Sequence, residues 1–274
     1  MKLSFLLNKI CSVSSIFDRE ITGLALDSRQ VKSGDLFFAY KGTQLDGREF
    51  IDEAIQKGAV AILVEEKTET HNVPIFIVEN LNQKISEIAA RFYNNPTKSL
   101  HIVGITGTNG KTSCSHFIAA ALQQLTIPCG IIGTLGYGVH GNIEPTHLTT
   151  PDAITLQKIL ANFLAKNIKT VTMEVSSHSL EQGRVDNIDF DIGIFTNLTR
   201  DHLDYHGTMQ AYAASKKKLF DNPRLNRAII NADDEFGKEM IHSLSAKKTI
   251  YAYSLRGSIE KVPTIFVDHV RLTS

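Results

Sequence analysis

The sequence predicts an α/β fold in two parts: a small N-terminal α/β domain, then a larger domain built on a mostly parallel sheet flanked by helices. Short apolar, β-branched runs alternate with stretches of helical period, which is typical of βαβ units. These units fall into two sets, separated at residues 94–99, where turn formers and a proline precede a strongly apolar run. We therefore expect domains at residues 1–95 and 96–274.

The first set of elements is short and describes the small domain. Its predicted strands are residues 36–40, 59–64 and 75–78, and its predicted amphipathic helices are residues 50–56 and 81–93. The second set describes the larger sheet. Its predicted strands are residues 101–105, 129–132, 170–175, 192–196, 228–231 and 249–253.

The composition excludes several classes of protein. The 274 residues are 42% apolar and 21% charged, and 29 Lys plus Arg balance 29 Asp plus Glu, so no basic field gathers nucleic acid or anionic lipid. The three cysteines lie far apart without metal-ligand spacing, so we expect neither a disulfide framework nor a zinc site. Lys9 interrupts the apolar start, and the apolar run at residues 59–64 is too short to span a bilayer. We expect a soluble cytoplasmic protein without membrane insertion.

A glycine-rich turn follows the first strand of the larger domain. The apolar strand at residues 101–105 leads into Gly-Thr-Asn-Gly-Lys-Thr, residues 107–112, and then into a helical stretch at residues 113–125. We call residues 107–112 the phosphate loop, because a glycine turn between a strand and a helix N-terminus is suited to bind a polyphosphate.

Each residue type in this loop has a chemical use. Gly107 and Gly110 let backbone N–H groups converge on anionic oxygens, Lys111 reaches terminal phosphates, and Thr112 can ligate magnesium. The spacing differs from the usual eight-residue motif, because the position six residues before Lys111 is Ile105 and not glycine. A plain glycine turn is the alternative, but the Lys-Thr pair directly after it favours an ATP or GTP site.

Two polar segments follow later apolar strands. Glu174 ends one strand and precedes polar groups at residues 176–184, which makes it a plausible magnesium ligand; a solvated strand end is the alternative. Residues 196–207 place two histidines and two aspartates within six positions. Oxygen-rich, sulfur-free ligands favour magnesium over zinc, whereas the alternative is a polar helix start with Asp201 near its N-terminus.

A predicted helix at residues 208–220 carries three consecutive lysines. Lys216 lies in the middle of its apolar stripe, whereas Lys217 and Lys218 point elsewhere and suit a solvated face. Burying an amine is costly unless it is paired or chemically altered. Lys216 therefore has a functional reason to be there, or it reaches solvent along the helix surface.

Taken together, these motifs resemble those of the Mur ligase family, the ATP-dependent enzymes that form amide bonds in the peptide of the bacterial cell-wall precursor. The resemblance runs from about residue 20 to about residue 255. Its further matching segments are residues 26–39, 46–48, 149–151, 173–178, 182–185, 196–207 and 231–234. They are most similar to the branch that adds the third amino acid, diaminopimelate or lysine, to UDP-N-acetylmuramoyl-L-alanyl-D-glutamate.

The resemblance implies a role for each matched residue. ATP would be bound by Gly107, Thr108, Asn109, Gly110, Lys111, Thr112 and Ser113, with Asn197 shaping the nucleotide side. The UDP end of the precursor would contact Leu26, Ser28, Thr43 and Gln44, and its sugar-peptide end Thr149, Thr150, Ser176, Gln182 and Arg184.

The same resemblance implies two magnesium sites. Thr112 and Glu174 would hold the ion on the ATP phosphates, and His202 with a carbamate on Lys216 would hold the second. The carbamate answers the question of the buried lysine, because it turns a cation into an oxygen ligand. Lys111, Glu174, His202 and Lys216 are thus the expected catalytic residues.

The implied reaction uses ATP and Mg²⁺ and needs no protein nucleophile. The γ-phosphate passes to the D-glutamyl carboxylate, and an incoming amine then displaces phosphate from the acyl phosphate. The expected partners are therefore the UDP-linked dipeptide and an amino acid, and we expect a monomer.

Two departures from the family pattern bear on this expectation. Thr43 stands where relatives often carry histidine, and the sequence stops at Ser274, before the family's third domain with its amino-acid pocket. We expect binding without turnover from this chain. Residues 221–224 match a tetrapeptide that marks diaminopimelate selectivity in the third domain of relatives, but here we interpret them as a chance turn. A folylpolyglutamate synthetase-like ligase and a non-catalytic binding module are the alternatives, and the UDP-type N-terminal domain disfavours the first.

Overall fold

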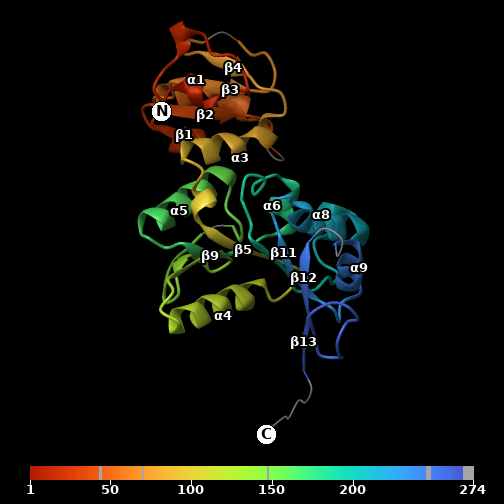
Figure 1. The fold of residues 1–274 in the computed structure, drawn as a ribbon. Helices are drawn as coiled ribbons and strands as arrows, with labels where there is room; N and C mark the ends of the chain where they lie inside the picture. The colour runs from red at the N-terminus through yellow and green to blue at the C-terminus, as the bar shows by residue number, and fades with distance from the viewer. Residues whose placement is uncertain (43–44, 70, 147, 245–247, 268–274) are drawn as a thin grey trace. The chain divides into compact units, whose positions relative to one another are not determined.

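The chain forms two compact units, which are described separately (Figure 1). The computed structural model describes residues 1–42, 45–69, 71–146, 148–244 and 248–267. The first unit contains residues 1–95, 153–158 and 182–187, and the second contains the remainder. Within the described residues, no helix combines the length and the apolar character needed to cross a bilayer.

The first unit is built on a four-stranded, fully parallel sheet in the order β1-β2-β3-β4. Its strands are β1 (Gly23–Ala25), β2 (Asp35–Ala39), β3 (Ala61–Val64) and β4 (Ile75–Ile77). Its α-helices are α1 (Leu3–Leu6), α2 (Ile51–Gln56) and α3 (Leu81–Phe92), and short 3-10 turns are η1 (Ser15–Phe17), η2 (Ser28–Gln30) and η3 (Gly47–Phe50).

Both faces of this small sheet are buried. Every residue of β2 and β3 is buried, and their side chains enter two apolar clusters, as expected for a parallel sheet covered on both sides. Leu81, Ile85 and Ile88 recur at helical spacing on α3 and form part of one cluster.

The second unit contains a nine-stranded sheet in the order β13-β12-β11-β10-β5-β9-β6-β7-β8, in which β7 pairs antiparallel with both β6 and β8 and the other described pairings are parallel. Its strands are β5 (His101–Thr106), β6 (Cys129–Gly133), β7 (Gly136–Val139), β8 (Asn142–Glu144), β9 (Thr170–Glu174), β10 (Ile192–Phe195), β11 (Arg227–Asn231), β12 (Thr249–Ser254) and β13 (Thr264–Phe266). Its helices are η4 (Pro96–Ser99), α4 (Lys111–Gln124), α5 (Ala153–Ala165, whose first six residues group with the first unit), α6 (Ser177–Glu181), α7 (Leu203–His206), α8 (Met209–Asp221) and α9 (Glu235–Leu244).

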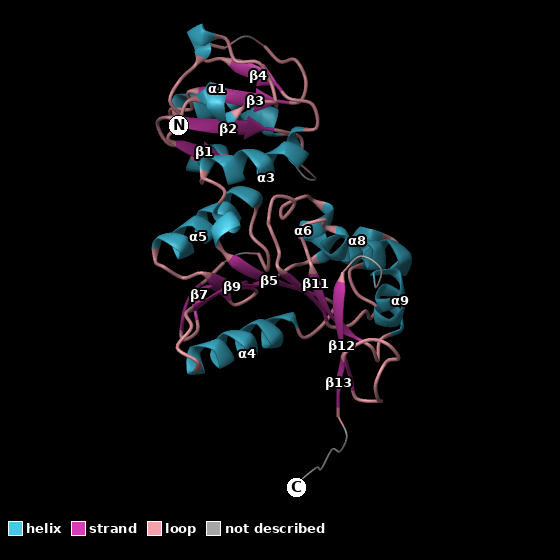
Figure 2. Cartoon of the chain, in the orientation of Figure 1, coloured by secondary structure: helices cyan, strands magenta, loops and turns pink. Residues whose placement is uncertain are grey.

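Helices lie on both faces of this sheet (Figure 2). On β6, Ile131 clusters with Ala119 of α4, whereas a Cβ at the adjacent Gly130 would meet Phe163 of α5. Because successive strand residues point to opposite faces, α4 and α5 cover opposite sides. The predicted α/β fold with a mostly parallel second sheet is confirmed.

A pair of glycines lets α8 approach the sheet closely. Gly104 of β5 and Gly193 of β10 are neighbours in register. A Cβ on Gly104 would lie 2.7 Å from the Phe190 ring and 3.2 Å from Leu219 of α8, and one on Gly193 would lie 3.0 Å from Phe220. Because neither glycine has a side chain, α8 can pack close against β5 and β10.

The predicted strands and helices all occur, with ends shifted by one or two residues in most cases. The structure adds β1, the β7–β8 hairpin, β13, the longer helices α5 and α9, and several short helices that the sequence analysis did not specify. Residues 221–224 end α8 and form a turn in which the Asn222 side chain accepts from the Arg224 backbone N–H at 2.9 Å. The proposed boundaries of functional domains stay a prediction.

We predict that Gly104→Ala destabilises the second unit by about 1–3 kcal/mol, because the added methyl overpacks the contact between β5 and α8. Denaturant unfolding followed by circular dichroism measures the loss. Gly42→Ala is the control, since its Cβ would meet one loop carbonyl oxygen, at 3.2 Å, and no buried side chain. Equal stability of the Gly104 and Gly42 variants would contradict the close approach of α8.

Candidate functional site

The carboxyl edge of the second sheet gathers most of the predicted site residues. The phosphate loop follows β5, Glu174 ends β9, and Asn197 lies just after β10, and these three strands are neighbours. Sites in open parallel sheets lie at this edge, because the loops that leave adjacent strands diverge there.

The phosphate loop has the backbone shape that its glycines allow. Gly110 has a φ of 86° and is the N-cap residue of α4, which begins at Lys111. Gly107 has a φ of 142°, and a Cβ there would lie 1.9 Å from Thr196 Oγ1. Only glycine fits either position without strain. The free N–H groups at the start of α4 therefore face the end of β5, ready to bind an anion.

The segment after β10 braces this loop. The Asn197 side chain accepts from the Asn109 backbone N–H at 3.0 Å and donates to the Asn109 carbonyl at 3.1 Å. Thr196 Oγ1 donates to the same carbonyl at 2.7 Å, and the Thr108 N–H donates to the Asn197 carbonyl at 2.8 Å. Asn197 thus holds the phosphate loop by hydrogen bonds to the main chain of that loop. This contact is consistent with the expected place of Asn197 on the nucleotide side.

Lys111 folds back over the loop. Its Nζ donates to the carbonyls of Gly107 and Thr108 at 2.9 and 2.8 Å. Burial lowers the pKa of Lys111, and the negative charges of Glu174 and Asp201 oppose that shift. The amine is therefore held against the main chain of the phosphate loop.

Lys216 is buried in the apolar face of α8, as the sequence predicts. Its side chain is 1% exposed, its Nζ donates to the Gly107 carbonyl at 3.0 Å, and it lies 4.2 Å from the centroid of the Tyr212 ring. Burial first, and then the charge of Lys111, lower the pKa of Lys216 to about 7, while Asp201 opposes the shift. A neutral, nucleophilic amine is thus accessible near neutral pH.

The carboxylate of Glu174 is buried and held from both oxygens. The Thr134 backbone N–H donates to Oε1 at 2.8 Å, and the Thr134 hydroxyl lies 3.2 Å from Oε2. A Cβ on Gly133 would lie 2.1 Å from Oε1. The end of β6 is therefore shaped around this acid.

Three of the residues expected at the sugar-peptide end lie together beside Glu174. Thr149 Oγ1 is 3.1 Å from the Thr134 hydroxyl. The Thr150 hydroxyl donates to the Glu174 carbonyl at 2.9 Å and contacts the Ser176 hydroxyl at 3.2 Å. These hydroxyls form a polar network around the end of β9.

An imidazole cluster lies near α6, α7 and α8. The His178 ring centroid is 4.9 Å from that of His202 and 5.5 Å from that of His206. His206 Nε2 is 2.9 Å from the Ser177 hydroxyl, and burial is the main cause that lowers the pKa of His206. His202 is half-exposed with its Nε2 3.6 Å from Asp201, so it is more accessible than His206.

Oxygen donors of the kind that magnesium prefers are available here. The Glu174 carboxylate and the Thr112 hydroxyl at the start of α4 fit a magnesium ion that keeps waters and phosphate oxygens as its other ligands. Across the described part of the chain, no three His, Cys, Asp or Glu side chains are grouped to hold a metal by themselves. An ion at this edge would therefore depend on the nucleotide for part of its coordination.

The remaining predicted substrate residues belong to the first unit. Leu26 and Ser28 line a cavity of about 370 Å³, and the Ser28 hydroxyl donates to Glu53 at 2.5 Å. Thr43 and Gln44 lie outside the described residues. Arg184 donates to the Gln182 side-chain oxygen, with Nε at 2.9 Å.

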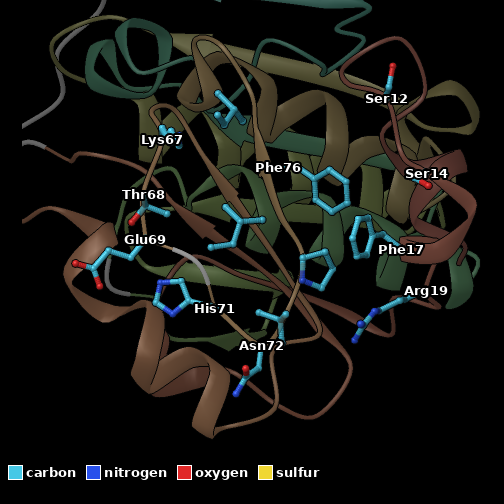
Figure 3. A pocket seen from close by; sticks show the side chains of 14 residues that line it. Ser12, Ser14, Phe17, Arg19, Lys67, Thr68, Glu69, His71, Asn72 and Phe76 are labelled. Atoms are coloured by element: carbon cyan, nitrogen blue, oxygen red, sulfur yellow. The ribbon is translucent and has the colours of Figure 1, made fainter.

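A larger cavity of the first unit, about 550 Å³, contains none of the predicted residues (Figure 3). Its lining comes from the segment around η1 and from residues that precede and form β4, including Phe17, Arg19, His71 and Phe76. Cavity size alone therefore does not locate the site, and the predicted nucleotide residues lie instead at the second sheet, near a half-buried lysine, a buried lysine and a buried acid.

Sequence reasoning missed three residues that shape the site. Thr134 holds Glu174, Thr196 anchors the phosphate loop, and the Tyr212 hydroxyl lies 3.3 Å from Thr108 Oγ1. Thr134 directly follows β6, so the rule that places sites at the carboxyl ends of parallel strands was a signal that could have found it.

Comparison with known families agrees with this geometry. The sequence profile of the Mur ligase middle domain matches residues 105–270. The chain belongs to the Mur ligase family. A second profile, described as the Mur ligase family catalytic domain, matches residues 20–93.

Individual Mur ligases extend the match. The diaminopimelate-adding UDP-N-acetylmuramoyl-L-alanyl-D-glutamate ligase of Coxiella burnetii is 48% identical over 241 residues, which are 86% of this chain and 49% of the relative. A solved structure of an enzyme with the same name superposes with a TM-score of 0.83 at 36% identity, over 94% of this chain and 53% of that one. The chain thus spans about half the length of these relatives.

A folylpolyglutamate synthase of Mycobacterium tuberculosis, complexed with ADP and AMPPCP, is less similar. It gives a TM-score of 0.52 at 15% identity and covers 63% of this chain and 48% of its own. This likeness concerns the fold alone. The folylpolyglutamate synthetase-like ligase, one of the alternatives from the sequence, is therefore a weaker match than the diaminopimelate-adding ligases.

We predict that Lys111→Ala weakens the affinity for magnesium and a non-hydrolysable ATP analogue about 10- to 100-fold, because a charge-assisted hydrogen bond to phosphate is lost. Isothermal titration calorimetry measures this affinity. Lys166→Ala, which removes an exposed lysine at the end of α5, is the matched control. Unchanged affinity in the Lys111 variant would show that the phosphate loop is not the nucleotide site.

Proposed function

We propose that this chain provides the precursor-binding and ATP-binding parts of an amide ligase that adds diaminopimelate to UDP-N-acetylmuramoyl-L-alanyl-D-glutamate. The names of the relatives support this substrate, because two ligases that are 48% and 46% identical to this chain are named for it. ATP as the energy source is supported by the phosphate loop and by the two lysines that donate to it, Lys111 within the loop and Lys216 on α8. We propose that the reaction takes place in the cytoplasm, because its proposed substrates are a UDP-linked precursor and ATP.

The observation that carries the proposal is the convergence of two amines on one carbonyl beside a buried acid. Lys111 and Lys216 both donate to Gly107, and Glu174 ends the adjacent strand β9. Phosphoryl transfer asks a protein mainly for positioning and charge neutralisation. This edge supplies both.

The proposed reaction begins with attack of the D-glutamyl carboxylate on the γ-phosphorus of ATP. The bond to the β-γ bridging oxygen breaks, ADP leaves, and an acyl phosphate forms. The amine of diaminopimelate then attacks the acyl carbon, expels inorganic phosphate and loses a proton, which leaves the amide. Lys111 and the N-terminus of α4 neutralise the γ-phosphate during the first step.

Magnesium, held by Thr112 and Glu174, would supply charge neutralisation at the phosphates when bound. Asn197 and Thr196 keep the loop in the shape that meets those phosphates. At the substrate end, Leu26, Ser28, Thr43 and Gln44 would bind the UDP group, and Thr149, Thr150, Ser176, Gln182 and Arg184 the sugar and peptide.

Lys216 is proposed to act as a carbamate. Its neutral amine attacks CO₂, a C–N bond forms, and one proton leaves, which yields an anionic oxygen donor in place of a cation. His202 would complete that ligand pair. The depressed pKa of Lys216 favours this reaction, because only the neutral amine is nucleophilic.

We predict a Lys216 carbamate that can be detected by ¹³C NMR after incubation with ¹³C-bicarbonate. A pKa of about 7 leaves Lys216 mostly protonated near pH 6 and mostly neutral near pH 8, so the signal should increase over that interval. Lys216→Gln should remove the signal and Lys217→Gln should keep it. A signal that persists without Lys216, or one that falls as pH rises, would rule this modification out.

We predict that, in the whole ligase to which this chain contributes, activation of the precursor can be trapped with hydroxylamine, which attacks the acyl phosphate and gives a hydroxamate plus phosphate. The hydroxamate should require both ATP and UDP-N-acetylmuramoyl-L-alanyl-D-glutamate, and mass spectrometry detects it. UDP-N-acetylmuramoyl-L-alanine lacks the glutamyl carboxylates and is the matched control.

The same assay tests the competing function. A pteroylglutamate substrate replaces the precursor in a parallel reaction, and full assays compare diaminopimelate with lysine as the incoming amine. Hydroxamate formed from pteroylglutamate and not from the precursor would favour the folate ligase. Equal use of lysine would remove diaminopimelate specificity from the proposal.

A further inference from the structure

Thr134 is the residue through which the carboxylate of Glu174 is fixed. Its backbone N–H bonds one carboxylate oxygen at 2.8 Å, and its hydroxyl lies 3.2 Å from the other. Gly133, directly before it, leaves the room that this approach requires, since any Cβ there would overlap the acid. The position of the acid thus depends on the end of β6 as well as on its own strand.

The same hydroxyl faces a second partner. Thr134 Oγ1 lies 3.1 Å from Thr149 Oγ1, so one hydroxyl with a single proton stands between Glu174 and Thr149. It can donate to the carboxylate and accept from Thr149, or it can donate to Thr149 and leave the carboxylate. Two hydrogen-bond arrangements are therefore available without any backbone movement.

The loop that carries Thr149 is also tied to the main chain of Glu174. The Thr150 hydroxyl donates to the Glu174 carbonyl at 2.9 Å, and the Ser176 N–H donates to Thr150 Oγ1 at 3.1 Å. A change at the acid consequently reaches residues 149–150 through short, direct contacts that all lie within the second unit.

We propose that Thr134 is a positioning residue that couples nucleotide binding at Glu174 to precursor binding at Thr149. This inference rests on the proposed function, which assigns the cation to Glu174 and the precursor to Thr149. A cation at Glu174 makes the carboxylate a poorer acceptor, so the Thr134 hydroxyl turns its proton to Thr149. The Thr149 hydroxyl is then free to donate to an oxygen of the precursor.

The coupling has a definite sign. Because Thr149 gains a free proton only when the acid is engaged, the magnesium complex of a non-hydrolysable ATP analogue should tighten precursor binding. By linkage, the precursor should tighten binding of the analogue by the same factor. Coupling between sites typically amounts to about 5- to 150-fold, and we expect a value within this range.

The test measures precursor affinity by isothermal titration calorimetry, with and without the magnesium–AMPPNP complex. Thr134→Val keeps the shape and the backbone N–H but lacks the hydroxyl, so the coupling factor should fall to about 1. Because Thr149 then has no Thr134 hydroxyl to donate to, precursor affinity without nucleotide should rise toward the affinity that the unaltered chain shows with nucleotide. Thr134→Ser restores the hydroxyl and should restore the coupling. Thr249→Val, an exposed position on β12, is the matched control and should behave like the unaltered chain.

The outcomes separate the two proposals. Coupling that survives in Thr134→Val, or that is lost equally in Thr134→Ser, overturns the role of the hydroxyl, as does a coupling factor of 1 in the unaltered chain. If the unaltered chain does not bind the precursor at all, the proposed function itself is wrong and this inference fails with it. Thermal unfolding of each variant shows whether a lost coupling comes from a lost fold.

Discussion

The second unit depends on the carbonyl oxygen of Gly107. Two lysine amines from different helices donate to it, one from the start of α4 and one from the buried face of α8. A buried amine without an acceptor costs several kcal/mol, so this single acceptor makes an interior lysine tolerable. It also keeps the two amines close, and burial first, then the charge of Lys111, lowers the pKa of the amine on α8. The Gly107 carbonyl therefore both stabilises the buried Lys216 and holds the two amines at the phosphate loop.

Much of this arrangement could be predicted from the sequence, because its signals are local. An apolar strand running into a glycine turn and a Lys-Thr pair gives the phosphate loop, and helical periodicity places Lys216 among apolar residues on α8. The burial of that lysine is confirmed. Glu174 was found for a similar reason, because it ends a strongly apolar strand.

Other features could not be found this way because their cause is non-local. Thr134 and Glu174 are 40 residues apart and meet only because β6 and β9 are neighbours in the sheet. Asn197 resembles an ordinary loop residue until β10 lies beside β5, when its amide pairs with the main chain of Asn109. The β7–β8 hairpin, an antiparallel edge on a parallel sheet, has too few residues for a clear alternation. The roles of the site residues stay predictions, since each depends on a bound partner.

The paired glycines of β5 and β10 have a consequence for how this protein tolerates change. Leu219, which touches the space above Gly104, is one helical turn from Lys216, so the depth of α8 also sets the reach of the amine. A substitution at either glycine would first alter packing in the interior, at positions that touch no ligand. Its second effect would be to withdraw the amine from the phosphate loop. The contact of the amine with the phosphate loop therefore depends on two residues that have no side chains as well as on the lysine itself.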